Sequence, residues 1–96
     1  MTSKERAYLM SLAHNLDTIL HVGKGSVTPE MTTAVEEAIN KRELIKINVL
    51  KNCADDPKTI GQIIAERTHS QLVQVIGRKI VLYKENKDNP KITFPR

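Results

Sequence analysis

The stretch VGKGSVTPEM, residues 22–31, holds the turn and helix-start signals from which the fold can be inferred. The apolar run Leu16–Val22 before it is typical of a β-strand, and Thr28 followed by Pro29 is typical of a helix N-cap with proline in the first turn. We therefore predict a loop between a strand and a helix. Helix-start N–H groups and the cation of Lys24 would favour an anion there, whereas a plain structural turn built on the glycines is the alternative.

Outward from this loop, hydrophobic periodicity predicts alternating helices and strands. The expected elements are a first helix capped by Ser3, the strand Leu16–Val22, a helix Pro29–Lys41, a strand Leu44–Leu50, a helix Pro57–Thr68 capped by Asp56, and the strands Gln71–Ile76 and Ile80–Lys84 joined by a hairpin at residues 77–79. Crossover helices between parallel strands, followed by a hairpin, give a mixed sheet.

The order α-β-α-β-α-β-β predicts a two-layer α/β fold with a mixed four-stranded sheet. In so short a chain we expect the helices to lie on one face of the sheet, because helices on both faces would leave little core for each. Ile45, Ile47 and Val49 alternate with polar residues and are expected to face the core. The opposite face, which carries Lys46 and Asn48, is expected to be open.

Length and composition fit a single domain, residues 1–96, in which residues 85–96 form a C-terminal basic tail or a short edge strand. No apolar run is long enough to cross a bilayer, and the first residues lack the apolar core of a secretory signal. A cytoplasmic protein is therefore expected. The single cysteine, Cys53, cannot form an internal disulfide and is expected to be a small apolar filler or a surface thiol.

The net charge of +4 is concentrated near the end of the chain. Residues 1–77 balance nine Lys/Arg against nine Asp/Glu, whereas residues 78–96 hold six basic and two acidic residues. A local basic excess favours a polyanion such as nucleic acid, although a solvated charged tail is an equally common interpretation. The only aromatic residues are Tyr8, Tyr83 and Phe94, which argues against a surface that stacks bases on aromatic rings. Contacts to nucleic acid should therefore go mainly to its backbone.

The spacing of reactive residues argues against catalysis. A strand, a glycine loop with a lysine and a helix resemble a P-loop, but Lys24 is followed by Gly25 and the upstream glycine is absent. The histidines and Cys53 do not have metal-ligand spacing, and no pattern assembles a nucleophile, a base and an orienting acid. We expect no enzyme activity, no metal and no cofactor.

Several short motifs occur in a fixed order: LAH at 12–14, VGKGSVT at 22–28, RELIK at 42–46, QVIG at 74–77, IVLYK at 80–84 and FPR at 94–96. Together they resemble the CRM domain family, specifically its small stand-alone bacterial proteins of the YhbY and YqeI type. The resemblance implies an RNA-binding domain with the order α-β-α-β-α-β-β, like the C-terminal domain of a bacterial translation initiation factor. It also implies a role tied to ribosomal RNA in large-subunit precursors. Related domains in plant organelles serve intron splicing.

In this family the glycine loop is a GxxG motif, comparable to the KH-domain loop that holds an RNA backbone. Here the four residues are Gly23, Lys24, Gly25 and Ser26, so that serine stands where the motif has its second glycine. A left-handed serine is unfavourable by roughly 1 kcal/mol. We therefore expect either that residue 26 is not left-handed or that Gly25 takes the bend, and the serine hydroxyl can itself donate to phosphate.

The leading hypothesis is a monomeric, non-catalytic RNA-binding protein that binds ribosomal RNA in large-subunit precursors, assists ribosome assembly and has no membrane partner. The residues expected to contact RNA are Gly23, Lys24, Gly25, Ser26, Lys4, Arg6, Arg42, Lys46, Arg78, Lys79 and Lys84. The alternative is a protein-interaction module, in which the sheet edge or the basic tail meets an acidic protein and RNA contact is incidental.

Overall fold

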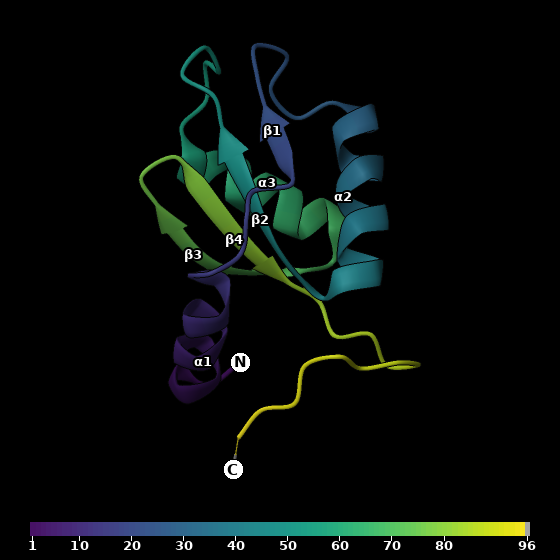
Figure 1. The fold of residues 1–96 in the computed structure, drawn as a ribbon. Coiled ribbons are helices and arrows are strands. Elements are labelled where there is room, and N and C mark those ends of the chain that lie inside the picture. Colours follow the sequence, from purple (N-terminus) through teal and green to yellow (C-terminus); the bar gives the residue numbers. More distant parts are fainter. Residues whose placement is uncertain (96) are drawn as a thin grey trace.

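The computed structural model describes residues 1–95, so Arg96, the last residue of the expected tail and of the FPR motif, lies outside the described residues. The elements are α1 (Ser3–Ala13), β1 (Leu20–Val22), α2 (Pro29–Arg42), β2 (Leu44–Val49), α3 (Pro57–Thr68), β3 (Gln71–Ile76) and β4 (Lys79–Tyr83), as Figure 1 shows. The predicted α/β class and the order α-β-α-β-α-β-β are confirmed.

The strands form one mixed sheet in the order β1-β2-β4-β3. β1 pairs parallel to β2, with His21 opposite Asn48, and β4 pairs antiparallel to both β2 and β3. The predicted hairpin between β3 and β4 is present, and Gly77 is left-handed in its turn with a φ of 57°. A β-bulge between Leu72 and Gln74 interrupts the register of β3. The expected mixed four-stranded sheet is therefore confirmed.

Helices α2 and α3 pack on one face of the sheet and enclose the larger part of the core. Ile45, Ile47 and Val49 of β2 are buried there, as their alternation predicted. The helical residues buried in the same cluster are Val35, Ile39, Ile60, Ile64 and Ala65. Cys53 is also buried in it, so this cysteine is a small apolar filler rather than a surface thiol. Each fully buried aliphatic side chain stabilises the fold by roughly 1.5 to 3 kcal/mol.

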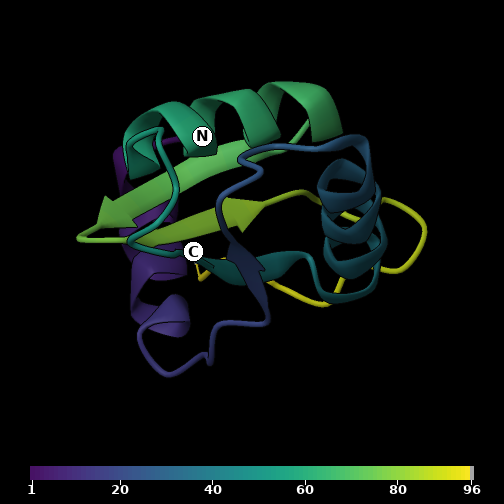
Figure 2. The same cartoon turned by 90° about the horizontal axis from the view of Figure 1, so that it is seen from above.

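Helix α1 lies on the opposite face of the sheet from α3 (Figure 2), so the expectation that all helices share one face is wrong. Leu9 and Ala13 of α1 pack in a second buried cluster with residues of three strands, namely Leu44, Val73, Val81 and Tyr83. These strand residues are apolar on the face that the alternation of β2 marked as open, and apolar area on a sheet face must be covered. Lys46 and Asn48 lie on this face and remain partly exposed.

The helices begin at side-chain caps. The predicted caps Thr28 and Asp56 are confirmed, because their side chains accept the backbone N–H groups of Met31 and Thr59. For α1 the predicted cap Ser3 is wrong, since Thr2 is the N-cap. The Thr2 hydroxyl accepts from the Glu5 N–H at 3.1 Å, while the Glu5 carboxylate accepts from the Thr2 N–H at 2.9 Å. This capping box needs Glu three residues after the cap, and the third residue after Ser3 is an arginine.

Strand β1 is shorter than the predicted strand Leu16–Val22. Regular pairing begins at Leu20, although the Ile19 N–H already donates to the Lys46 carbonyl at 3.0 Å. Because α1 ends on one face of the sheet and β1 lies at its edge, residues 14–19 have to carry the chain from that face to the edge. The apolar run before the loop is therefore divided between a connection and a short strand.

The chain after β4 is held by the buried carboxylate of Glu43. Its oxygens accept the backbone N–H groups of Asn86 and Ile92, each at 2.7 Å, and that of Lys91. Burial opposes the charge, but these three donors outweigh it and hold the pKa of Glu43 below its ordinary value. Residues 85–95 contain no strand, so the described part of the tail is irregular and anchored rather than an edge strand.

Candidate nucleic-acid interface

The glycine loop, residues 23–28, lies beside the loop of residues 50–56 at one end of the sheet (Figure 1). β1 and β2 are parallel neighbours with Val22 opposite Val49, so both strands deliver their following loops to the same edge. The Leu50 N–H donates to the Val22 carbonyl at 2.8 Å, which carries the pairing one residue beyond the strands. A ligand held by the first loop therefore also meets the second.

Ser26 adopts a left-handed backbone conformation, which its side chain disfavours. Its φ is 57°, and its N–H donates to the Gly23 carbonyl at 3.0 Å to close the turn. Both expectations for this position are wrong, because residue 26 is left-handed and Gly25 does not take the bend. The Ser26 hydroxyl donates to the Asp55 carboxylate at 2.6 Å, and this contact offsets part of the conformational penalty.

Neither Gly23 nor Gly25 has a positive φ that would require a glycine, in contrast to Gly77. A Cβ at Gly23 would meet the Leu50 side chain at 3.5 Å, and a Cβ at Gly25 would meet Thr28 at 3.5 Å, both of which are ordinary van der Waals distances. The fold itself would therefore accept side chains at both positions. What the glycines provide is a loop whose backbone can be approached closely from outside.

The start of α2 offers fewer backbone N–H groups to an anion than its position suggests. The Met31 N–H is taken by the Thr28 hydroxyl at 3.1 Å, and the Thr32 N–H donates to the Thr28 carbonyl at 3.0 Å. Pro29 has no N–H, and Glu30 adds a negative charge in the first turn. An anion at this loop would therefore depend mainly on Lys24 and the loop backbone, rather than on the helix start.

Three of the predicted basic residues lie at this end of the sheet. Lys24 is exposed in the loop, and Arg78 and Lys79 are exposed in the β3–β4 hairpin. Arg78 reaches the second loop, because its guanidinium donates to the Leu50 carbonyl at 3.3 Å. Leu50 in turn pairs with Val22, so these contacts connect the hairpin to the glycine loop.

The other predicted basic residues lie further away. Lys46 is on the sheet face that α1 partly covers, whereas Arg42 and Lys84 lie at the opposite end of the sheet from the loops. Lys84 also has an internal role, since its ammonium donates to the Thr68 carbonyl at 3.2 Å at the end of α3.

Lys4 and Arg6 belong to α1, and they differ in their surroundings. The Arg6 guanidinium donates to the carbonyls of Leu72 and Val73 at 3.0 and 2.6 Å, so it fastens α1 to the edge strand β3. Lys4 lines a hollow of about 500 Å³ between α1 and the tail. The predicted set is thus brought together only in part, at the loops and the hairpin.

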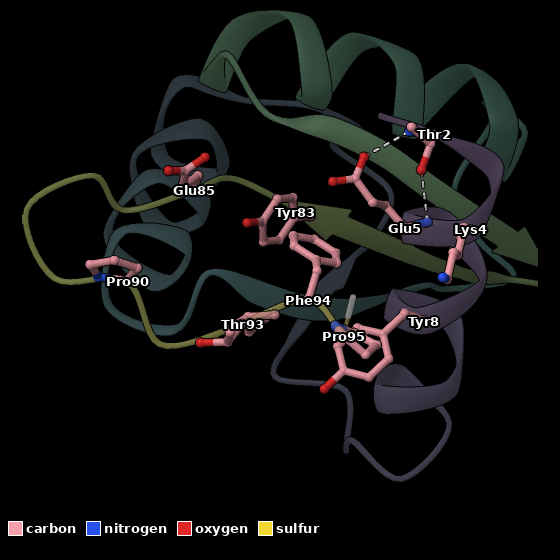
Figure 3. Close-up of a pocket in the computed structure, with 11 residues that line it drawn as sticks. Thr2, Lys4, Glu5, Tyr8, Tyr83, Glu85, Pro90, Thr93, Phe94 and Pro95 are labelled. Atoms are coloured by element: carbon pink, nitrogen blue, oxygen red, sulfur yellow. Dashed lines mark hydrogen bonds between the residues drawn. The ribbon is translucent and has the colours of Figure 1, made fainter.

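Aromatic rings line the hollow between α1 and the tail, as Figure 3 shows. Phe94 lies between Tyr8 and Tyr83, with centroid distances of 5.8 Å to each ring. These rings support one another and the tail, and the same hollow also contains the carboxylates of Glu5 and Glu85. The aromatic residues therefore serve packing, and the mixed charge makes this hollow a poor site for a polyanion.

The loop of residues 50–56 was missed by sequence reasoning. Lys51 and Asn52 are exposed in it, and the Asn52 side chain lies close to Gly23. Asp55, which precedes the predicted cap Asp56, accepts a hydrogen bond from the Ser26 hydroxyl. The signal that could have found this loop is the parallel pairing of β1 and β2, which places the two following loops together.

Two features bear on other classes of function. Among residues 1–95, no three His, Cys, Asp or Glu side chains are grouped in a way that could hold a metal ion. In the same part of the chain, no helix combines the length and the apolar character that crossing a bilayer requires.

The sheet has the order β1-β2-β4-β3, and the glycine loop lies between β1 and α2. The family model described as the CRS1/YhbY (CRM) domain matches residues 1–84. The chain belongs to this CRM domain family. The family membership inferred from the short motifs is thereby confirmed.

Two relatives and one solved structure match this CRM protein over nearly their whole length. The chain is 45% identical to a Bacillus subtilis protein named as the probable RNA-binding protein YqeI, over 99% of both chains. It is 31% identical to a Haemophilus influenzae protein named as an RNA-binding protein, covering all of this chain and 96% of that one. A solution structure from Staphylococcus aureus, described as that of a hypothetical protein and candidate RNA binder, has a TM-score of 0.83 at 45% identity, over 99% of both chains.

The CRM match ends at residue 84, at the point where β4 leads into the tail. Glu43, which anchors that tail, lies within the RELIK motif at 42–46 and therefore inside the matched region. The matched region thus covers Glu43 but not the residues of its three donors.

Proposed function

We propose that this protein is a non-catalytic RNA-binding protein whose glycine loop holds the RNA backbone. The observation that carries the proposal is the loop itself: Gly23 and Gly25 have no internal requirement for glycine, and they flank the exposed Lys24. A small loop with an accessible backbone and a mobile cation suits a phosphate. CRM family membership and the names of the relatives support RNA as the polyanion.

Arg78, Lys79 and Lys51 would extend the positive surface around the loop. Phosphate contacts position a protein without reading bases, so selectivity at this loop should come from the shape of the RNA. We propose ribosomal RNA in large-subunit precursors as the target, bound by a monomer in the cytoplasm during ribosome assembly. This finer assignment rests on the family resemblance.

Protein interaction through a sheet edge, the alternative function, finds little support in the geometry. The edge strand β1 is only three residues long. The other edge, β3, has a bulge, and two of its carbonyls accept from Arg6. Short edges, bulges and charged side chains are the features that keep edge strands from pairing with another chain. The tail remains the more plausible protein contact, but Glu43 and Phe94 tie it to the fold.

The test is the affinity for a fully paired, blunt-ended RNA duplex as a function of salt. Counterion release predicts a steep fall in affinity with salt, and Lys24→Glu should weaken binding and reduce the salt slope by about 1. The matched control is Lys41→Glu, the same charge change at the far end of α2. Salt-independent binding, or unchanged affinity in a folded Lys24→Glu protein, would contradict the proposal.

The ribosomal assignment needs a separate experiment in cells. Crosslinking with position-resolved RNA mapping should give sites clustered in large-subunit ribosomal RNA. Crosslinks scattered over messenger RNA, with no ribosomal enrichment, would reject that target while leaving RNA binding intact.

A further inference from the structure

The face of the sheet on which α1 packs carries a second hollow, separate from the one between α1 and the tail. Its volume is about 590 Å³, which lies within the range of sites for small organic ligands. It is bounded by the end of α1, with Met10, Ala13 and His14, and by the strands β2, β4 and β3. Of the residues that line it, only Lys79 also belongs to the positive surface proposed around the glycine loop.

The register of the strands explains which side chains meet there. Lys46 of β2 is opposite Val81 of β4, and Val81 is opposite Gln74 of β3. In the next row toward the loops, Lys79 is opposite Ile76. Paired residues share a face, so Lys46 and Lys79 are diagonal neighbours across adjacent strands. Two ammonium groups therefore flank one hollow.

The lining combines three kinds of group. Val81 and Ala13 are buried and apolar, and Ile76 adds an apolar side chain that is 59% exposed. The Gln74 amide and the His14 imidazole bring hydrogen-bond donors and acceptors. Among the described residues that line the hollow, none is acidic. The lining thus combines apolar residues, polar side chains and two lysines.

We propose that this hollow receives an unpaired nucleobase of the RNA whose backbone the glycine loop holds, an inference that rests on the proposed RNA binding. A nucleobase has flat apolar faces, a polar edge and a phosphate on each side of its nucleotide. The apolar faces match the buried Val81 side chain, and the polar edge matches the Gln74 amide. The phosphates match the ammonium groups of Lys46 and Lys79. A base within a duplex is stacked and paired, so only a loop, bulge or single-stranded end could supply it.

Residues of the β3–β4 hairpin link the hollow to the glycine loop. Lys79 adjoins Arg78, whose guanidinium donates to the Leu50 carbonyl, and a Cβ at Gly23 would touch the Leu50 side chain. An RNA strand bound at Lys24 can therefore run along the hairpin onto the sheet face. No such path is needed for a peptide.

An acidic peptide is the competing occupant, since it would also suit the positive rim. The hollow lies on the face of the sheet, however, where the strand hydrogen bonds are already made between β2, β4 and β3. A peptide placed there could not pair its backbone with a strand, which is the usual source of its affinity for a sheet. A nucleobase has no such need.

Two blunt-ended RNA duplexes with identical paired sequences test the proposal, one fully paired and one with a single bulged nucleotide. The wild-type protein should bind the bulged duplex about tenfold more tightly, a difference of about 1.4 kcal/mol. Gln74→Ala and Ile76→Glu should each remove most of this preference, and Gln74→Ala should leave the salt slope measured with the fully paired duplex unchanged. The matched control is Gln62→Glu, which adds the same charge on the exposed face of α3.

The variants distinguish a failure of the proposed base site from a failure of the proposed RNA binding. Lys24→Glu should weaken binding to both duplexes equally, and if neither duplex binds in a salt-dependent way, the proposed function itself fails. If both bind but the wild type does not prefer the bulge, or both hollow variants keep the preference, the hollow is not a base site. An acidic peptide that shifts the backbone amide NMR signals of Gln74, Ile76 and Lys79, when the bulged RNA does not, would also overturn it.

Discussion

The Ser26 hydroxyl donates a hydrogen bond of 2.6 Å to Asp55, and this bond joins the two loops at the end of the sheet. It supports a left-handed serine at the fourth position of the glycine loop, with a φ of 57°. The loop therefore keeps a conformation that suits glycine, and a contact from the neighbouring loop offsets the cost of the side chain.

Substitutions at Ser26 separate the contribution of its hydrogen bond from that of its left-handed backbone. Ser26→Ala loses the hydrogen bond and keeps the unfavourable φ, so the free energy of unfolding should fall by about 1 to 2 kcal/mol. Ser26→Gly loses the same bond but relieves the backbone, and should be more stable than Ser26→Ala by roughly 1 kcal/mol. Urea denaturation measures both. Equal stability of the alanine and glycine variants would show that residue 26 is not left-handed in solution.

The anchoring of the tail predicts a large effect of Glu43→Gln. The amide keeps one acceptor oxygen, but its NH₂ group faces N–H donors from the tail. Leaving buried donors unsatisfied should lower the free energy of unfolding by about 2 to 3 kcal/mol. Amide hydrogen exchange should increase first at Asn86, Lys91 and Ile92. Glu85→Gln, the same chemical change at an exposed position on the tail, should have little effect.

The same carboxylate gives a pH dependence. The pKa of Glu43 is below its ordinary value of 4.5 in the folded state, so its ionised form stabilises the fold. This contribution is fully present above about pH 4.5 and is lost as the pH falls through the lower folded pKa. Thermal melts from pH 7 to pH 2 should show wild type and Glu43→Gln converging in stability at low pH. A constant difference between them would contradict the ionised state of Glu43.

Arg6 should matter more for stability than for RNA. Arg6→Met keeps most of the aliphatic stem but removes the donors to Leu72 and Val73, so we expect a loss of about 1 to 2 kcal/mol in unfolding free energy. RNA affinity of the folded variant should fall less than that of Lys24→Glu. A larger affinity loss with unchanged stability would make Arg6 a phosphate contact.

Local signals in the sequence predicted most of the elements. Thr28 with Pro29, and Asp56 with Pro57, mark helix starts through contacts within one turn, so neighbouring residues suffice to find them. The face on which α1 packs could not be predicted in this way. Helical spacing shows that Leu9 is buried, but not against which side of the sheet.

The candidate site was predictable only where its signal is local. The glycine loop and Lys24 are adjacent in sequence, and the loop was found from its composition. The contact from Ser26 to Asp55 spans 29 residues, and the bonds from Glu43 to the tail span 43 or more. A carboxylate in the sequence does not reveal which distant N–H groups it will accept, so these roles required the structure.

The position of α1 between β3 and the tail also determines when this half of the molecule can be completed during synthesis. Arg6 and Tyr8 are made early, but their partners Val73 and Phe94 come 67 and 86 residues later. Contacts between residues so far apart are slow to form, because a long loop must close first. Until residue 94 has emerged from the ribosome, Leu9 has only part of its final cover, and α1 is a candidate for protection by a chaperone.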